Sequence, residues 1–169
     1  MNENTVTLRP FYDRDQQQML DILTDKTVAK TYMLPDFETR EAAIPLFERL
    51  LGLSADPVRY VRCIELDGVA IGFTNDVEIV DSSIELGYVI HPAHHGHGYM
   101  TEALGLAIRG LHHKGYTEVI CGAFEGNTAS LRVMEKCGMI KSEHSDTLQY
   151  RGKTHRCLYY TAVKENHYA

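Results

Sequence analysis

The stretch HPAHHGHGYMTEAL, residues 91–104, holds the feature on which the interpretation of this sequence depends. Gly96 and Gly98 lie between a segment of strand character, SIELGYVIH, and a segment whose apolar residues recur at helical spacing. Glycine allows a positive φ and a close approach of the backbone to a ligand. The first N–H groups of a helix have no acceptor within the helix, and the helix dipole favours negative charge there. The stretch therefore predicts an anion site suited to a phosphate or pyrophosphate.

A metal site is the alternative that the histidines of this stretch raise. Zinc needs three or four ligands that converge on one point, whereas the adjacent His94 and His95 point to opposite sides of an extended chain. No HExxH pair is present in the sequence. We therefore predict no metal, with the histidines at the surface of the loop. ATP and NAD are also disfavoured, because the loop lacks a Gly-Lys-Ser/Thr ending and follows several antiparallel strands.

The chain as a whole has the composition of an ordinary globular domain. Its 169 residues predict one domain that is long enough to bury a full core. A formal net charge of −6 argues against general nucleic-acid binding. No apolar run approaches the roughly 20 residues that span a bilayer, and the polar start MNENTVTLRP has no signal-peptide pattern. We therefore expect a cytoplasmic protein without a membrane partner. Four cysteines without close spacing are expected to be reduced thiols.

Apolar periodicity predicts an α/β (α+β) fold with a mostly antiparallel sheet and one strand–helix–strand crossover. Asp67-Gly68 is a strong hairpin signal between two of the strands. The predicted strands cover residues 5–11, 59–66, 69–79, 83–91, 117–124, about 140–149 and about 156–163. The predicted helices cover residues 12–25, 39–53, about 98–114 and 127–138.

Two motifs in this order resemble the GNAT N-acetyltransferases. IELGYVIHPAHHGHGYMTEAL is similar to their acyl-CoA-binding motif, Gln/Arg–Gly–x–Gly–x–Gly/Ala, which residues 95–100 match. NTASLRVMEKCGM resembles the ribosomal-protein-alanine acetyltransferase branch, the RimJ/RimL-like enzymes, and the resemblance covers about residues 5–163. It implies a mixed sheet of about seven strands, flanked by about four helices and splayed at the central strands. It also implies a single acyl-CoA N-acyltransferase domain over residues 1–169, as a monomer or homodimer.

The resemblance implies acetyl-CoA as the donor. The pyrophosphate would lie on backbone N–H groups of residues 96–101, and the pantetheine would pair with the strand before the loop. The implied cofactor-binding residues are Tyr88, Val89, Ile90, His95, Gly96, His97, Gly98, Tyr99, Met100, Thr101, Asn127 and Ser130. Asn127 also suits a helix N-cap. His95 replaces the usual Gln or Arg, so cofactor affinity is expected to rise as the pH falls through about 6.5.

Catalysis needs a group that accepts a proton from the amine and a group near the leaving thiolate. An α-amino group, with a pKa near 7.8, loses its proton more readily than a lysine near 10.4, so a modest base suffices for it. We predict Glu85 as the base, although an exposed strand position explains it equally simply. Ser130 matches the serine that the RimJ/RimL-like branch places near the thiol, and Met134 stands where many GNAT enzymes have a tyrosine. A glutamate of that branch corresponds to Gln149, which cannot act as a base.

The acceptor site in this family comes from the first helices and the closing strands. We predict that Tyr32, Phe37, Gln149 and Tyr150 contribute to it, with aromatic rings able to contact a cation. A solvated loop and a packed sheet tyrosine are the structural alternatives. The predicted function is transfer of an acetyl group to a primary amine, either a protein N-terminal α-amine or a small molecule, in a ternary complex. The alternative is a non-catalytic domain that binds or senses acyl-CoA.

Overall fold

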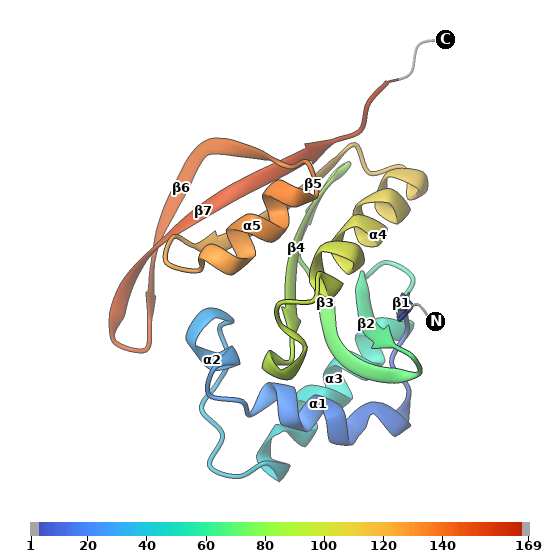
Figure 1. Cartoon of the computed structure of the whole chain (residues 1–169), viewed down its shortest axis with the longest axis vertical. Helices are drawn as coiled ribbons and strands as arrows, with labels where there is room; N and C mark the ends of the chain where they lie inside the picture. Colours follow the sequence, from blue (N-terminus) through green and yellow to red (C-terminus); the bar gives the residue numbers. More distant parts are fainter. Residues whose placement is uncertain (1–3, 167–169) are drawn as a thin grey trace. The chain divides into compact units, whose positions relative to one another are not determined.

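The structure is a computed structural model that describes residues 4–166 (Figure 1). The strands are β1 (Val6–Arg9), β2 (Val61–Leu66), β3 (Val69–Val80), β4 (Ser83–Ile90), β5 (Glu118–Phe124), β6 (Ile140–Tyr150) and β7 (Lys153–Val163). The α-helices are α1 (Gln16–Leu23), α2 (Val28–Thr31), α3 (Ile44–Ala55), α4 (Tyr99–Lys114) and α5 (Thr128–Lys136). The strands form one seven-stranded sheet in the order β1-β2-β3-β4-β5-β7-β6. The predicted α/β class is therefore confirmed, and the single-turn helix α2 is an addition that periodicity did not reveal.

The sheet is mixed, and its parallel pair lies in the middle. β1–β2, β2–β3, β5–β7 and β6–β7 pair antiparallel. β4 and β5 pair in parallel from Ser83 and Glu118 to Leu86 and Cys121. This register ends there, although β4 runs on to Ile90 and β5 to Phe124. The helix that crosses between them is α4, as the sequence predicts.

The described chain divides into two compact units. Unit 1 comprises the chain up to Asp76 together with Tyr88–Ala103, and unit 2 comprises Val77–Gly87 together with the chain from Leu104 onward. β3, β4 and α4 each contribute residues to both units. The single functional domain expected over the whole chain stays a prediction.

The core of unit 1 forms between the apolar faces of α1 and α3 and the first strands. Met19, Leu20 and Leu23 recur at helical spacing on α1 and are almost completely buried. Phe11 contacts the Phe47 ring edge to face, at 6.0 Å between centroids. Burial of these large side chains stabilises the unit by about 1.5–3 kcal/mol for each one.

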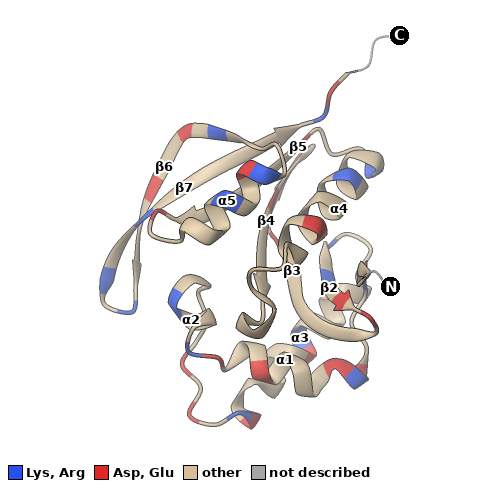
Figure 2. Cartoon of the chain, in the orientation of Figure 1, with Lys and Arg blue, Asp and Glu red and all other residues tan. Residues whose placement is uncertain are grey.

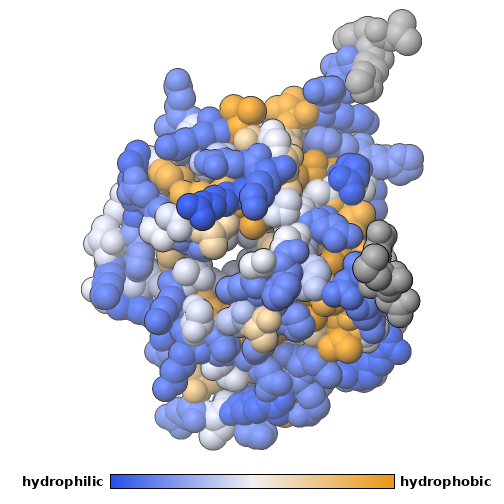
Figure 3. Space-filling model, in the orientation of Figure 1, coloured by the Kyte–Doolittle hydropathy of each residue, from blue (hydrophilic) through white to orange (hydrophobic). Residues whose placement is uncertain are grey.

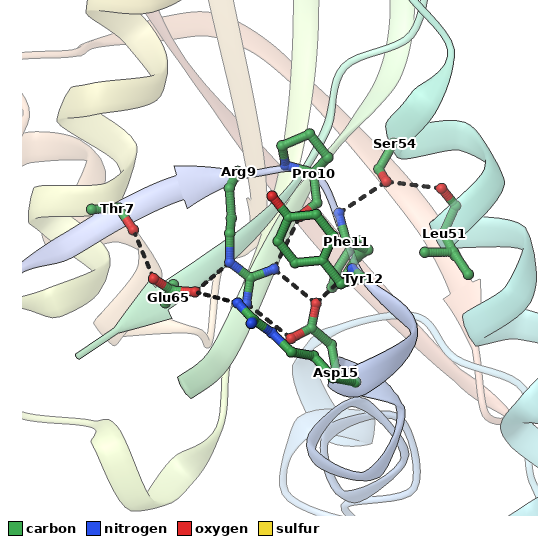
Figure 4. Close-up of polar contacts among 10 residues, drawn as sticks. Thr7, Arg9, Pro10, Phe11, Tyr12, Asp15, Leu51, Ser54 and Glu65 are labelled. Atoms are coloured by element: carbon green, nitrogen blue, oxygen red, sulfur yellow. Dashed lines mark hydrogen bonds and ion pairs between the residues drawn. The ribbon is translucent and has the colours of Figure 1, made fainter. Parts of the chain in front are cut away.

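Arg9 lies at the centre of a polar network that ties β1 to the start of α1 and to β2 (Figure 4). Its two Nη atoms donate to the Asp15 carboxylate at 2.8 and 2.9 Å, and its Nε donates to Glu65. The Tyr12 N–H also donates to Asp15, at 2.8 Å. The Asp15 side chain is only 4% exposed, so the network satisfies a buried charge on every side. Burial alone would raise the pKa of Asp15, but the hydrogen bonds from Arg9 and Tyr12 outweigh burial and lower it.

The helices of unit 2 cover one face of its strands. Leu104, Leu111 and Met134 are fully buried, as is Cys121 of β5. The Tyr160 hydroxyl donates to the Glu135 carboxylate of α5 at 3.0 Å, which fixes α5 on this face beside β7 (Figure 1).

Positive and negative residues are scattered over the elements in the view of Figure 2. On the face drawn in Figure 3, hydrophobic residues form separate patches among hydrophilic ones. The exposed large apolar side chains of unit 2 are Val77, Val80, Ile140 and Val163. Within residues 4–166, no helix combines the length and the apolar character that crossing a membrane requires.

Gly72 of β3 lies where β4 approaches most closely. A Cβ at this position would lie 2.2 Å from the Val89 carbonyl oxygen and 2.9 Å from the Ile90 Cα. Both are backbone atoms, so neither can move aside as a flexible side chain would.

We expect Gly72→Ala to lower the free energy of unfolding by more than about 3 kcal/mol, the upper end of overpacking costs. Gly52→Ala in α3 is the control, because no atom lies within 4 Å of the added Cβ; it should stabilise by about 0.5–1 kcal/mol. Equal changes in the free energy of unfolding for Gly72→Ala and Gly52→Ala, measured by urea denaturation, would contradict this account.

Asp15 makes the stability of the protein dependent on pH. Its folded pKa is lowered, so its contribution is present above the unfolded value of about 3.9 and is lost as the pH falls through the folded value. We expect Asp15→Asn to destabilise by about 3 kcal/mol at pH 7, since Arg9 loses a buried partner but keeps Glu65. The difference in free energy of unfolding between this variant and the unmodified protein should become smaller below about pH 4. Asp13→Asn, at an exposed neighbour, serves as control. If the difference in free energy of unfolding stayed constant from pH 7 to pH 3, the charge of Asp15 would not contribute to stability.

Candidate functional site

The loop between β4 and α4 belongs entirely to unit 1 and carries two glycines in the left-handed region. Gly96 has φ +78° and Gly98 has φ +80°. No atom lies within 4 Å of a Cβ added at either position, so glycine is required by the backbone conformation and the space above it is open. The loop holds no Lys, Arg, Asp or Glu (Figure 2). Any anion bound here would therefore be held chiefly by backbone N–H groups and histidines.

Hydrogen bonds fix both ends of this loop. The His91 N–H donates to the Ile71 carbonyl of β3 at 2.8 Å, which marks the end of β4. His95 folds back, with its Nε2 at 3.1 Å from the Ile90 carbonyl oxygen. Because a carbonyl only accepts, Nε2 is the donor in this contact. The His97 ring stacks on Tyr99 at 5.3 Å between centroids, with 9° between the planes.

The first turn of α4 follows this loop directly along the chain. The Tyr99 hydroxyl accepts from the Asn4 side chain at 2.8 Å, which anchors the helix start. Intrahelical bonding begins with the Glu102 N–H donating to the Gly98 carbonyl at 3.0 Å. The Met100 side chain is 8% exposed and belongs to the core. The methionine side chain is therefore packed in the core, so it does not occupy the open space above the two glycines.

The structure gives the histidines of the loop no metal-binding geometry. Within residues 4–166, no group of three or more His, Cys, Asp or Glu side chains is placed to hold a metal ion. Burial lowers the pKa of His94, and the neighbouring His91, His97 and His95 lower it further. Burial and the neighbouring rings therefore disfavour the protonated form of His94.

Tyr32 and Phe37, predicted to contact the acceptor, both pack against the core of unit 1. The Tyr32 hydroxyl donates to the Asn75 side chain at 2.7 Å, and its ring meets Phe73 edge to face at 5.5 Å. Burial raises the pKa of Tyr32, so the phenol stays neutral. Both residues thus have a structural role, and acceptor contact stays a prediction for them.

Glu85, the predicted base, lies on the part of β4 that belongs to unit 2. It is half-buried, and none of the described residues forms a hydrogen bond or ion pair with its carboxylate. Burial raises its pKa, and the carboxylates of Glu78 and Asp146 raise it further, while His144 opposes them. A carboxylate with a raised pKa and no cationic partner accepts a proton more readily than an ordinary glutamate does.

Asn127 and Ser130 lie at the start of α5. The Asn127 side-chain oxygen accepts from the Ser130 N–H at 3.2 Å, so the predicted N-cap is confirmed. Contact of either residue with a cofactor stays a prediction. Met134 is fully buried, so its side chain is part of the core and does not line a polar site.

Gln149 and Tyr150 end β6 at its hairpin with β7. Gln149 donates to the Thr154 hydroxyl across the hairpin and is exposed. Tyr150 lies near the Phe124 ring, at 6.0 Å, and Phe124 stacks on His155 at 4.3 Å. The predicted acceptor tyrosine is therefore part of an aromatic cluster.

Two residues near Glu85 were missed by sequence reasoning, namely Asp146 and Tyr159. The Tyr159 hydroxyl donates to Asp146 at 2.8 Å, and Asp146 acts electrostatically on Glu85. Gly122, inside a buried strand, was the available signal, because glycine in a strand often marks a close approach of another group. Sequence alone does not say which group approaches.

Comparison with known proteins places this geometry in a family. A family model described as "Acetyltransferase (GNAT) domain" matches residues 5–140. A GNAT-family acetyltransferase from Bacillus anthracis is 22% identical, with 95% of each chain covered and a TM-score of 0.81. A spermidine N-acetyltransferase from Vibrio cholerae, in complex with CoA and spermine, is 16% identical, with 94% of this chain and 95% of that chain covered and a TM-score of 0.78.

The ribosomal L7/L12 α-N-protein acetyltransferase RimL, in complex with coenzyme A, is 15% identical, with 94% of each chain covered and a TM-score of 0.82. No curated protein sequence matches the chain. At these identities the solved structures establish the fold, and the family model, which matches most of the chain, establishes the family. The chain belongs to the GNAT acetyltransferase family, as the two sequence motifs predicted.

Proposed function

We propose that this chain is an acetyl-CoA-dependent N-acetyltransferase that moves an acetyl group directly to a primary amine. The observation that carries the proposal is the loop from His95 to Thr101, with two left-handed glycines between the end of β4 and the first turn of α4. Family membership supports this role for the loop, since similar solved structures hold CoA. We further propose that the whole chain acts as one acyltransferase domain.

The donor would be held mainly by backbone groups. The N–H groups of residues 96–101 lie at the positive end of α4 and suit a pyrophosphate. The open space above Gly96 and Gly98 leaves the backbone accessible to a phosphate, which supports the fit. Tyr88, Val89 and Ile90 would pair with the pantetheine along β4. Asn127 and Ser130 at the start of α5 are the proposed further contacts.

Acetyl-CoA supplies the activated thioester, and the chain supplies the proton transfers. Glu85 would accept the proton that the attacking amine loses, directly or through water. The Ser130 hydroxyl would donate a hydrogen bond to the leaving sulfur. Its neighbour on the next helical turn, Met134, has no polar group to take this role.

Two acceptor classes stay open within this proposal. One similar structure is a spermidine N-acetyltransferase and another acetylates the N-terminus of a ribosomal protein. The RimJ/RimL-like motif in α5 favours a protein N-terminal amine, and Tyr32, Phe37, Gln149 and Tyr150 are the proposed acceptor contacts. Gln149, in place of a glutamate, favours the alternative of a domain that binds acyl-CoA without turnover.

Release of free thiol from acetyl-CoA in the presence of an amine library tests the activity. The library should contain polyamines, amino acids and peptides with free N-termini. We expect turnover with at least one class, and Glu85→Gln should lower kcat by about 10²–10⁴-fold. Glu125→Gln, at an exposed residue paired with Arg156, is the matched control and should keep the full rate. CoA binding without turnover of any amine would favour the sensing alternative.

Gly98→Ala tests the donor site. The added methyl meets open space but forces a strained φ, so CoA affinity should fall by about tenfold, equivalent to about 1.4 kcal/mol. Gly68→Ala in the β2–β3 hairpin carries the same kind of strain, with φ +87° and open space, away from the loop. Both variants should lose similar stability, but only Gly98→Ala should bind CoA more weakly in calorimetry. Unchanged affinity in Gly98→Ala would place the donor elsewhere.

A further inference from the structure

One face of the unit 2 sheet carries polar side chains that the proposed chemistry does not yet use. Directly opposed residues share a face, and so do alternate residues along one strand. Glu85 opposes Ile120, and Tyr159 opposes Gly122, two positions further along β5. Cys157 opposes both Phe124 and Asp146. Glu85, Tyr159 and Asp146 therefore lie on the same face of the sheet.

Tyr159 is held in place from two sides. A Cβ at Gly122 would lie 2.7 Å from the Tyr159 Cε1 and 3.0 Å from its Cδ1, so the ring edge occupies the space of the missing side chain. The hydroxyl donates to Asp146 Oδ2 at 2.8 Å. His144 lies 3.3 Å from the same oxygen through its Nε2, and its ring stacks on Tyr159 at 5.3 Å. Ring packing and hydrogen bonding together fix the position of the Asp146 carboxylate.

We propose that Tyr159 is a positioning residue that acts on Glu85 through Asp146, because it holds the Asp146 carboxylate on the sheet face that carries Glu85. The inference rests on the proposed function for its catalytic meaning, because Glu85 is the base in that proposal. The effect of Tyr159 and Asp146 on the titration of Glu85 does not depend on turnover and can be measured without it.

The charged and titratable groups that act on Glu85 come from β3 and β6. Burial raises the pKa of Glu85 most, followed by Glu78 of β3 and Asp146 of β6, while His144 of β6 lowers it. Burial raises the pKa of the Cys121 thiol of β5 and of Cys157 and Tyr159 on β7, and the Glu85 charge raises each of them further. These three groups are neutral near pH 7, so they add no charge there. Glu78 and Asp146 are the negative charges that add to the effect of burial in raising the pKa of Glu85.

The adjacent residue of β7 supplies a matched control. Tyr160 also donates its hydroxyl to a carboxylate, that of Glu135, at 3.0 Å. It opposes Cys121 and therefore lies on the other face, beside α5 (Figure 1). Tyr160→Phe thus removes the same kind of hydrogen bond one residue away, without touching the Glu85 face.

The experiment is a carboxyl ¹³C NMR titration of Glu85 in the full chain, with the signal assigned by its loss in Glu85→Gln. Asp146→Asn should lower the pKa of Glu85, because a negative charge is removed. Tyr159→Phe should shift it in the same direction by the same amount or less, since the Asp146 carboxylate is no longer held. Tyr160→Phe should leave it unchanged. An unchanged Glu85 titration in Asp146→Asn and Tyr159→Phe, or an equal shift in Tyr160→Phe, would overturn the inference.

Gly122→Ala gives a second route to the same result. The methyl group should displace the Tyr159 ring and lower the Glu85 pKa as Tyr159→Phe does, whereas Gly110→Ala in α4, with open space around it, should not. Should Gly122→Ala fail to fold, Tyr159→Phe alone decides the outcome. A folded Gly122→Ala protein with an unchanged Glu85 titration would contradict the role of ring packing.

The pH dependence of kcat/KM separates this inference from the proposed function. If Glu85 is the base, the acidic limb of the profile should move to lower pH in Asp146→Asn by the same number of pH units as the NMR titration, with no movement in Tyr160→Phe. A shifted titration without a shifted limb would refute Glu85 as the base while supporting the coupling. A shifted limb without a shifted titration would refute the coupling.

Discussion

The close passage of β4 beside β3 at Gly72 is the constraint from which the loop between β4 and α4 follows. The Val89 carbonyl lies where a side chain at residue 72 would be, so β4 can reach this position only because residue 72 has none. The His91 N–H then bonds the Ile71 carbonyl and ends the strand, and His95 folds back on Ile90. The two left-handed glycines reverse the chain into α4. Each step fixes the next, so the loop is positioned by backbone contacts together with the side chain of His95.

Three glycines in this structure serve three purposes, and the sequence distinguishes them poorly. Gly98 supplies a left-handed φ in open space. Gly72 leaves room for the backbone of β4, and Gly122 leaves room for the Tyr159 ring. A motif reveals the first kind, because loop, strand and helix are adjacent in the chain. The other two depend on partners 17 and 37 positions away, at Val89 and Tyr159, and only the folded sheet brings them together.

The same distinction explains how much of the fold and site the sequence predicts. α4 and its loop are evident from local periodicity, and Asn127 is evident as a cap, because these depend on neighbours in the chain. α2 is missed because one turn is too short to show a period. Asp146 and Tyr159 are missed because their relation to Glu85 arises from strand register across β5, β6 and β7, which no local pattern encodes.

Two carboxylates, one buried and one half-buried, show how different surroundings push the pKa of the same kind of chemical group in opposite directions. Asp15 receives Arg9 and a backbone N–H, and these partners lower its pKa and keep it ionised. Such a group holds its charge too firmly to accept a proton near neutral pH. Glu85 has no such partner among residues 4–166, and burial together with two like charges raises its pKa. Environments that push the pKa values of similar groups apart assign them different roles. By this criterion Asp15 belongs to the framework of unit 1, and Glu85 is the carboxylate whose surroundings prepare it to take up a proton.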